Sequence, residues 1–197
     1  MKRLLMSIVA CVAVCAASMA QSIYEKAEAA FENKQYEEAI ALYRLCAEEG
    51  DSEALNKMGG MYVMGLGVEA NPQKAFELFT EAAEKGNLKA LCNLGLLYED
   101  GNGVQKDILK AIECYTEAAK LGETEAMKRL GVIYLFGTDG IAQDTDKAIE
   151  WFVKATEQGD YESYYALGLI YENRIYHRND LLGKRCDCLR PTHKCYL

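Results

Sequence analysis

Histidine is scarce in this chain of 197 residues. The two histidines, His177 and His193, both follow residue 173, so the serines and cysteines before that point have no evident imidazole base. The serine motif Ser-x-x-Lys and the triplet Lys-Thr-Gly are also missing. These absences argue against nucleophilic catalysis in the main part of the chain.

Basic residues are few between residues 21 and 173, where 14 lysines and arginines stand against 28 aspartates and glutamates. The segment 174–197 reverses this balance, with six basic and two acidic residues. An acidic surface repels phosphate backbones, so nucleic acid is not an expected partner of the main domain. The length suits one compact domain or one short array, at roughly 100–200 residues per domain.

Long apolar runs are missing after the first 20 residues, MKRLLMSIVACVAVCAASMA. Lys2 and Arg3 precede this run and Ser18-Met19-Ala20 ends it, a pattern typical of a cleaved export signal. We therefore expect residues 1–20 to be removed, and the mature protein to be periplasmic or secreted, with no membrane span. Two alternatives are a membrane anchor, for which the run is short, and a lipoprotein acylated at Cys11.

Six cysteines remain after residue 20, in two groups. Cys46, Cys92 and Cys114 stand alone at helical positions, where the expected role is a small buried apolar side chain. The tail adds Cys186, Cys188 and Cys195 next to His193. These four side chains resemble zinc ligands, but their spacing fits no standard finger, and disulfides are an open alternative. No metal site and no cofactor is expected.

The chain repeats itself from residue 52 onward, in the segments 52–87, 88–123 and 124–160. Each segment has an apolar stripe Ala-x-x-x-Met/Leu-x-x-x-Tyr, followed by Ala-x-x-x-Phe/Tyr-x-x-Ala. Both stripes have the spacing of one helix face, so each segment predicts a pair of helices. A glycine recurs inside the first helix of each pair, which predicts close approach of the second helix; these glycines are Gly59, Gly95, Gly131 and Gly168.

Paired glycines between the two helices predict a corner. Gly101-Asn102-Gly103 is not expected to bind phosphate, because no strand precedes it and no Lys-Ser/Thr pair follows. Asn71, Asp107 and Asp144 stand where a side-chain oxygen caps the next helix, and Pro72 occupies a first turn. Further glycines predict the helix ends, at Gly86, Gly122 and Gly159.

The pattern LG-x-x-Y-x-x-G-x-GV followed by KA-x-x-x-Y/F-x-x-AA-x-x-G resembles the Sel-one-like repeat, a branch of the tetratricopeptide superfamily. The resemblance covers 52–160 and a half repeat at 161–173, while residues 21–51 resemble an ordinary tetratricopeptide helix pair. It implies an all-α fold, a right-handed superhelical solenoid of antiparallel helix pairs whose first helices line a concave face. It also implies a non-catalytic adaptor that binds protein or peptide partners.

Carrying the concave positions of the superfamily onto this sequence gives the expected partner-binding residues, which are Asn56, Val63, Met64, Lys89, Leu96, Glu99, Asp100, Lys128, Val132, Leu135 and Phe136. The apolar members would form a floor edged by carboxylates, which suits a partner segment with apolar anchors and basic flanks. The alternative is that these apolar side chains pack against neighbouring repeats.

Some exported, cysteine-rich members of the family have been described as penicillin-binding or β-lactamase-like, which gives a catalytic alternative. Those members resemble one another in pairing a cysteine that ends a second helix with one early in the next first helix. Here Leu55 stands opposite Cys46, and Ala83 stands opposite Cys92. The missing pairing weakens this alternative, and we expect no catalytic residues.

The repeat stops after residue 173, where Arg174 replaces the expected glycine and no second-helix stripe follows. A truncated gene or a displaced reading frame would give such a basic tail. The last first-helix would then expose Leu167, Ile170 and Tyr171. We therefore expect a frayed end, or one covered by another chain through self-association.

Overall fold

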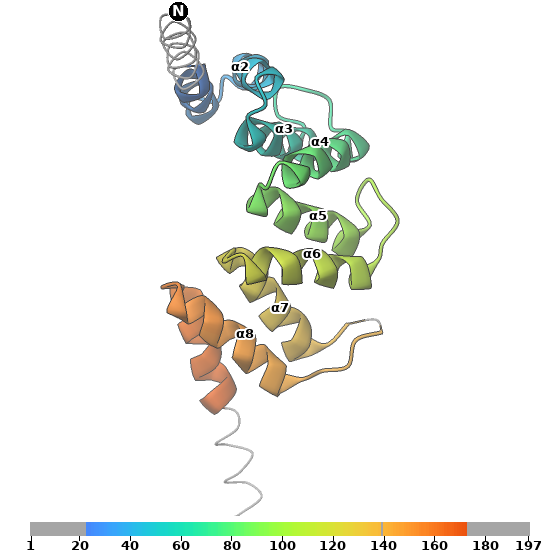
Figure 1. The fold of residues 1–197 in the computed structure, drawn as a ribbon, viewed down its shortest axis with the longest axis vertical. Coiled ribbons are helices and arrows are strands. Elements are labelled where there is room, and N and C mark those ends of the chain that lie inside the picture. The colour runs from blue at the N-terminus through green and yellow to red at the C-terminus, as the bar shows by residue number, and fades with distance from the viewer. Residues whose placement is uncertain (1–22, 139, 173–197) are drawn as a thin grey trace, which may run out of the picture. The chain divides into compact units, whose positions relative to one another are not determined.

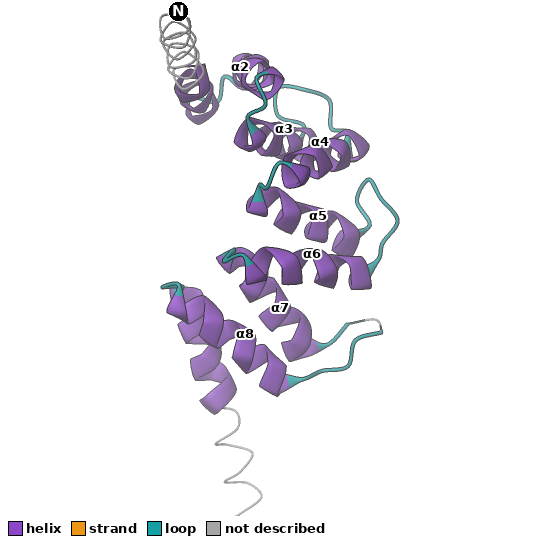
Figure 2. Ribbon diagram, viewed as in Figure 1, coloured by secondary structure: helices purple, strands orange, loops and turns teal. Residues whose placement is uncertain are grey.

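The structure is a computed structural model that describes residues 23–138 and 140–172. Within these residues the elements are helices, and Figure 2 shows them joined by loops and turns. One isolated bridge pairs Thr138 with Ile141 in a corner. The helices are the segment 23–32, α2 (Tyr36–Glu48), α3 (Ser52–Met64), α4 (Pro72–Glu84), α5 (Leu88–Asp100), α6 (Ile108–Lys120), α7 (Thr124–Phe136), α8 (Thr145–Glu157) and the segment 161–172.

The chain divides into two compact units between Ala126 and Met127, inside α7. The predicted signal peptide and the basic tail with its cysteines and histidines lie outside the described residues. None of the described helices has the length and apolar character needed to cross a membrane.

The first unit consists of successive helix pairs. Neighbouring helices in the sequence contact one another from α2 to α6. Figure 1 shows the long corner between α5 and α6 at one end of these helices and the short turn between α4 and α5 at the other. A continuous core of small and apolar side chains joins these helices, as expected when single pairs cannot bury their apolar faces alone.

The glycines inside the first helices receive aromatic rings from the second helices, as predicted. A Cβ atom on Gly59 would lie 2.5 Å from the Phe79 ring, and one on Gly95 would lie 2.5 Å from the Tyr115 ring. Gly131 is covered by Phe152 in the same way, at 2.7 Å. The predicted contact of Gly168 lies outside the described residues. No described atom is within 4 Å of a Cβ position there, and the residues that would form a second helix follow residue 172.

The predicted caps are confirmed. The side chains of Asn71, Asp107 and Asp144 accept hydrogen bonds from backbone N–H groups three residues further on, at 3.0–3.1 Å. Pro72 occupies the first turn of α4. The helix-ending glycines have φ values of 85–99°, which side chains with a Cβ rarely adopt; they are Gly86, Gly122 and Gly159.

The paired-glycine corners have a second role that flexibility alone did not predict. Gly103 has φ 74°, and a Cβ atom there would overlap the Pro72 carbonyl at the start of α4. Gly67 has the same relation to the backbone of Tyr36. Each of these corners therefore packs against the start of the preceding second helix, which requires glycine at this position.

In the second unit, Leu167 and Ile170 are buried in a cluster with Ala148 and Phe152. The expectation that they would be exposed is wrong, because they face the preceding repeat. Tyr171, which was expected to be exposed, is 47% exposed.

Candidate functional site

A cavity of about 250 Å³ opens between α3 and α5 in the first unit. We call it the α3/α5 groove, and its lining residues are Gly60, Val63, Met64, Phe79, Asn93, Leu96, Leu97, Asp100 and Asn102. Four of the predicted partner-binding residues are among them, namely Val63, Met64, Leu96 and Asp100. Its volume lies below the roughly 300–1,000 Å³ of small-molecule pockets, so it suits single side chains of a partner better than a whole ligand.

The floor of the groove is rigid and apolar. Leu97 is 4% exposed and Phe79 is 2% exposed, since the Phe79 ring lies against Gly59 under the cavity. Gly60 keeps the α3 side of the cavity open because it has no side chain. Val63 and Leu96 are half-buried, and Met64 is 60% exposed at the rim. A flexible thioether at the rim adapts to different apolar side chains.

The rim carries one available negative charge. Asp100 ends α5, is exposed, and forms no ion pair with a lysine or arginine of the described chain. Asn93 donates its side-chain amide to Asn56 at 2.8 Å, linking α5 to α3 beside the groove. Asn56 is only 8% exposed. The structure therefore places Asn56 beneath the rim, where it positions Asn93.

Lys89 lies at the first turn of α5, outside the groove. Its ammonium group is 3.1 Å from the Glu53 carboxylate, which also accepts a hydrogen bond from Asn87 at 2.9 Å. Asn87 in turn caps α5 through the Ala90 N–H. This exposed pair joins the starts of α3 and α5 and contributes little to stability, at about 0–1 kcal/mol.

Glu99 accepts a hydrogen bond from the Tyr115 hydroxyl at 2.7 Å. Tyr115 is fully buried, and a buried hydroxyl requires such a partner. The same repeat position holds Val63 beside Phe79 and Leu135 beside Phe152. The carboxylate thus occurs with tyrosine and the apolar residue with phenylalanine. Comparing repeats within the chain would have revealed this coupling, which the superfamily pattern alone did not.

The remaining predicted residues belong to the second unit and are described there by themselves. Lys128 is 2.8 Å from Glu162 and 3.7 Å from Asp160, so it ties α7 to the segment 161–172. Leu135 is half-buried beside the cluster of Phe152. Val132 is 46% exposed, and Phe136 is 74% exposed.

Two of the described cysteines are not activated as nucleophiles, and the described side chains form no candidate metal cluster. Burial raises the pKa of the Cys46 thiol, and burial with the nearby Glu117 and Glu113 raises the pKa of Cys114 to about 11. These thiols stay protonated at neutral pH, and the thiol is a poor nucleophile. No group of three or more His, Cys, Asp and Glu side chains within residues 23–138 and 140–172 is arranged to hold a metal ion.

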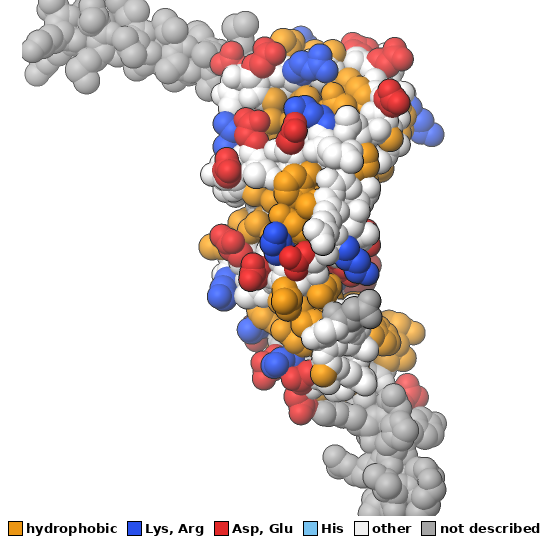
Figure 3. Space-filling model, turned by 90° about the vertical axis from the view of Figure 1, so that its right-hand side faces the viewer, with side chains coloured by type: hydrophobic (Ala, Val, Ile, Leu, Met, Phe, Trp, Pro, Cys, Tyr) orange, Lys and Arg blue, Asp and Glu red, His pale blue; other side chains and the backbone are white. Residues whose placement is uncertain are grey.

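Apolar and charged side chains alternate on the surface. On the face drawn in Figure 3, hydrophobic side chains form separate patches with Lys, Arg, Asp and Glu side chains between them. Such a surface offers small apolar contacts bordered by charge.

The helix pairs, the repeated packing and the groove define an all-α repeat solenoid. The family model of the Sel1 repeat matches residues 16–51, 52–87, 88–123 and 124–160. The chain therefore belongs to the Sel1 repeat family, as the sequence resemblance predicted. Sel1 repeat proteins are generally non-catalytic helical scaffolds that mediate protein interactions.

Solved structures agree with this assignment. A Sel1 repeat protein from Oxalobacter formigenes is 32% identical, with a TM-score of 0.68, over 75% of this chain and 60% of that protein. A protective antigen of uropathogenic Escherichia coli, c5321, is 32% identical with a TM-score of 0.69, over 78% and 34%. The immunity protein Pa5087 of Pseudomonas aeruginosa shares the fold at 23% identity, with a TM-score of 0.59, over 78% and 59%.

This chain thus spans 60% and 34% of the first two of these structures. No curated protein sequence matches it.

Proposed function

We propose that the protein is a non-catalytic adaptor that binds an extended or helical segment of a partner protein in the α3/α5 groove. The observation that carries this proposal is the cavity of about 250 Å³ with a buried apolar floor and, at its rim, the Asp100 carboxylate, which pairs with no described lysine or arginine. One apolar side chain of the partner fills the cavity, and a lysine or arginine beside it pairs with Asp100. A desolvated apolar anchor with a charged rim is the usual arrangement of strong contact sites.

The geometry of the groove indicates which residue types the partner segment carries. Leu96 and Val63 contact the anchor, and Met64 adjusts to its shape. Glu99 is not part of this contact, because it does not line the groove and one of its carboxylate oxygens accepts the hydrogen bond from Tyr115. The partner is therefore defined by an apolar residue with basic neighbours, and the charge contribution is expected to weaken at high salt.

A selection from a displayed peptide library tests the proposal. We expect the wild-type protein to enrich peptides with an apolar anchor flanked by lysine or arginine. Leu96→Glu places a charge in the groove and should reduce the affinity for these peptides at least tenfold. Leu109→Glu is the matched control, because Leu109 is 61% exposed on α6 and does not line the groove.

Two results would contradict the proposal that peptides bind in the α3/α5 groove. The first is selected peptides that bind Leu96→Glu as tightly as the wild type. The second is an enrichment of acidic peptides without apolar anchors. A Phe136→Glu variant extends the test to the second unit, where this exposed ring lies on the first helix of its repeat.

The proposal places the protein outside the cytoplasm, in the periplasm or secreted. The support is the sequence pattern of Lys2 and Arg3, the apolar run, and Ser18-Met19-Ala20. N-terminal sequencing of the protein recovered after export should give Gln21 as the first residue. Recovery of the uncleaved chain from the membrane fraction would support an anchor instead.

A further inference from the structure

Two glycines stand side by side inside α3, and they differ in what surrounds them. Gly59 receives the Phe79 ring, since a Cβ atom there would lie 2.5 Å from it. At Gly60 the nearest described atom to a Cβ position is the Met64 methyl carbon, 4.0 Å away. Glycine inside a helix lowers helix stability relative to alanine. The packing of the described chain therefore does not explain why residue 60 is glycine.

Other repeats carry larger side chains at the position of Gly60. The equivalent residues are Leu96 in α5 and Val132 in α7. The fold therefore accepts a bulky residue at this position of a first helix. A leucine or valine at residue 60 would extend into the cavity that Gly60 lines. The glycine thus keeps a space open in the α3/α5 groove.

Elsewhere in this protein, the space over a glycine of a first helix is filled by an aromatic ring of the second helix. The pairs are Gly59 with Phe79, Gly95 with Tyr115, and Gly131 with Phe152. A ring can contact the helix backbone directly at these positions because no Cβ atom separates the two. Gly60 offers the same kind of backbone surface on the side of the groove.

The cavity has room for a ring. Its volume is about 250 Å³, and an apolar protein cavity of ~150 Å³ is enough to hold benzene. Two of its lining residues favour an aromatic group over an aliphatic one, namely Met64 and Phe79. A thioether makes favourable contacts with aromatic rings, and aromatic pairs gain stabilisation beyond the area that they bury.

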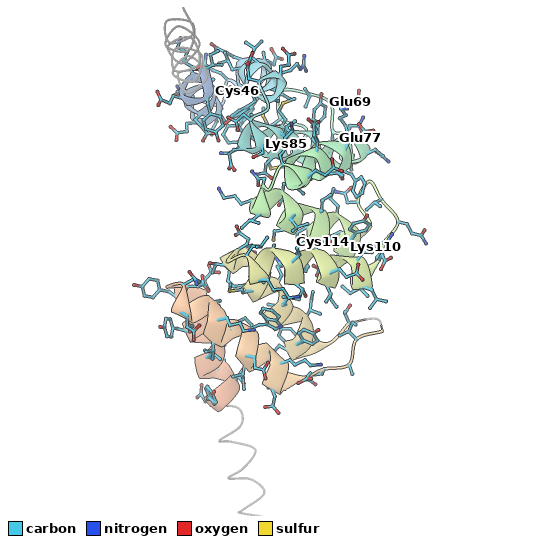
Figure 4. All side chains as sticks on the ribbon, viewed as in Figure 1. Cys46, Glu69, Glu77, Lys85, Lys110 and Cys114 are labelled. Carbon is cyan, nitrogen blue, oxygen red and sulfur yellow. The ribbon has the colours of Figure 1, made fainter. Side chains whose placement is uncertain are left out.

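The charge beside the cavity comes from α5. Glu77 and Lys110, which Figure 4 labels on α4 and α6, do not line the groove. Among the described lining residues, Asp100 is the charged one. The segment 21–173 also has twice as many acidic as basic residues, 28 against 14. Both features favour a partner with lysine or arginine beside its anchor.

We infer that the anchor of the partner segment is an aromatic residue whose ring lies on Gly60, and that Gly60 determines this preference by leaving the space open. The inference rests on the proposed function, because it specifies the anchor of the same groove. The partner segment therefore carries tryptophan, tyrosine or phenylalanine with a basic residue next to it.

A displayed library of short peptides tests the anchor. Each peptide carries one randomised position between two lysines. We expect the wild-type protein to enrich tryptophan, tyrosine and phenylalanine over leucine, isoleucine and methionine at this position. A synthetic peptide with tryptophan there should bind at least tenfold more tightly than the same peptide with leucine, as measured by fluorescence anisotropy.

Gly60→Leu is the decisive variant, because it reproduces the residue that α5 has at this position. Leucine favours the helix, so the unfolding temperature should stay equal or rise. The new side chain fills the cavity and should weaken binding of the tryptophan peptide at least tenfold, while the leucine peptide should lose less. Ala41→Leu is the matched control, since it adds a leucine at an exposed position of α2 that does not line the groove.

A second measurement locates the ring. The Met64 methyl carbon lies 4.0 Å from the Cβ position of Gly60, and the ring current of an aromatic group shifts the resonances of nearby methyl groups. The tryptophan peptide should therefore shift the Met64 methyl resonance strongly, and the leucine peptide should shift it much less. A Met64→Leu variant assigns the resonance.

The outcomes separate this inference from the proposed function. Equal enrichment of aliphatic and aromatic anchors, with binding still weakened by Leu96→Glu, would overturn the inference and leave the proposed function in place. Binding that Leu96→Glu does not weaken would contradict both. Equal binding of the tryptophan peptide by Gly60→Leu and the wild type would also overturn the inference. So would a wild-type dimer in light scattering that Gly60→Leu converts to a monomer, because a second copy would then be the occupant.

Discussion

Two neighbouring repeats of the first unit differ at one coupled pair of positions. In the α3–α4 pair, the buried ring belongs to Phe79, and Val63 on the first helix helps to form the groove. In the α5–α6 pair, the ring belongs to Tyr115, and Glu99 accepts a hydrogen bond from its hydroxyl. The difference teaches that the residue at this position of the first helix depends on the aromatic residue of the second helix that packs beside it.

The α7–α8 pair follows the same rule as α3–α4, with Leu135 beside the cluster of Phe152. The carboxylate at this position, Glu99, therefore has a structural role, since it satisfies the buried Tyr115 hydroxyl. Of the acidic residues expected to edge the binding surface, Asp100 lines the groove, whereas Glu99 does not line it and accepts a hydrogen bond from Tyr115.

The largest expected effect comes from filling the space above a first-helix glycine, where the aromatic ring of the second helix lies. In Gly95→Ala, the new methyl group would lie 2.5 Å from the Tyr115 ring, which is fully buried and cannot move aside. Overpacking costs about 1–3 kcal/mol, and a contact as short as 2.5 Å belongs at the upper end of this range. Alanine returns about 0.5–1 kcal/mol in the helix, so we expect a net loss of about 2 kcal/mol. Urea unfolding, with amide exchange in α5 and α6 as the local probe, measures this loss.

Gly60→Ala is the control for this experiment. It adds the same methyl group to α3, where the nearest atom lies 4.0 Å away. It should leave stability unchanged or increase it slightly. Equal stabilities of Gly95→Ala and Gly60→Ala would show that the ring is not held against the helix backbone.

The second prediction converts one repeat into the other. Glu99→Leu removes the carboxylate that accepts the hydrogen bond of the buried Tyr115 hydroxyl and should cost about 1.5 kcal/mol, within the range for the loss of such a bond. Adding Tyr115→Phe reproduces the pairing of Phe152 with Leu135 and should recover most of this loss. A double-mutant cycle measures the coupling. A coupling energy close to zero would show that the two positions vary independently.

The helices could be predicted well from the sequence because the same residue pattern recurs in each repeat. Stripes, caps and helix-ending glycines all depend on contacts within one repeat or with its neighbour, where spacing fixes geometry. The glycine rule holds at Gly59, Gly95 and Gly131, and its fourth case, Gly168, depends on residues after 172 that are not described. The exposure predicted for Leu167 and Ile170 was wrong because sequence spacing does not say which neighbour covers a face.

The site was less predictable than the fold. Superfamily positions identified Val63, Met64, Leu96 and Asp100, which do line the groove. They did not identify Phe79, which comes from a second helix, or Gly60, whose contribution is the absence of a side chain. They also could not show that Asn56 is buried and accepts a hydrogen bond from Asn93, because this contact depends on the distance between α3 and α5.

A smaller effect is expected at the helix cap of the same repeat. The Asp107 side chain accepts a hydrogen bond from the Lys110 N–H at 3.1 Å. Asp107→Ala should cost about 1 kcal/mol, a typical value for a lost cap. Asp107→Asn keeps the accepting oxygen and should retain most of the stability in urea unfolding. An equal loss in both variants would assign the effect to charge rather than to the cap.

The smallest effect concerns the other buried tyrosine, Tyr43, whose hydroxyl donates a hydrogen bond to Glu28. Burial opposes ionisation of Glu28, but hydrogen bonds from Tyr43 and Lys57 and the Lys57 charge hold the pKa of this carboxyl below its ordinary 4.5. The folded pKa is therefore below the unfolded one. The stabilisation is complete above the unfolded pKa and is lost as pH falls through the folded pKa.

Tyr43→Phe removes one of these hydrogen bonds and brings the folded pKa closer to the unfolded value. We expect the unfolding midpoint of this variant to change less than that of the wild type between about pH 6 and about pH 3. Tyr36→Phe is the control, because Tyr36 is a half-buried tyrosine of the same helix that packs on Phe31. If Tyr43→Phe and the wild type lose the same stability as the pH falls, the hydrogen bond to Glu28 does not determine how stability depends on pH. The Glu28 carboxylate would then serve only to satisfy the buried Tyr43 hydroxyl.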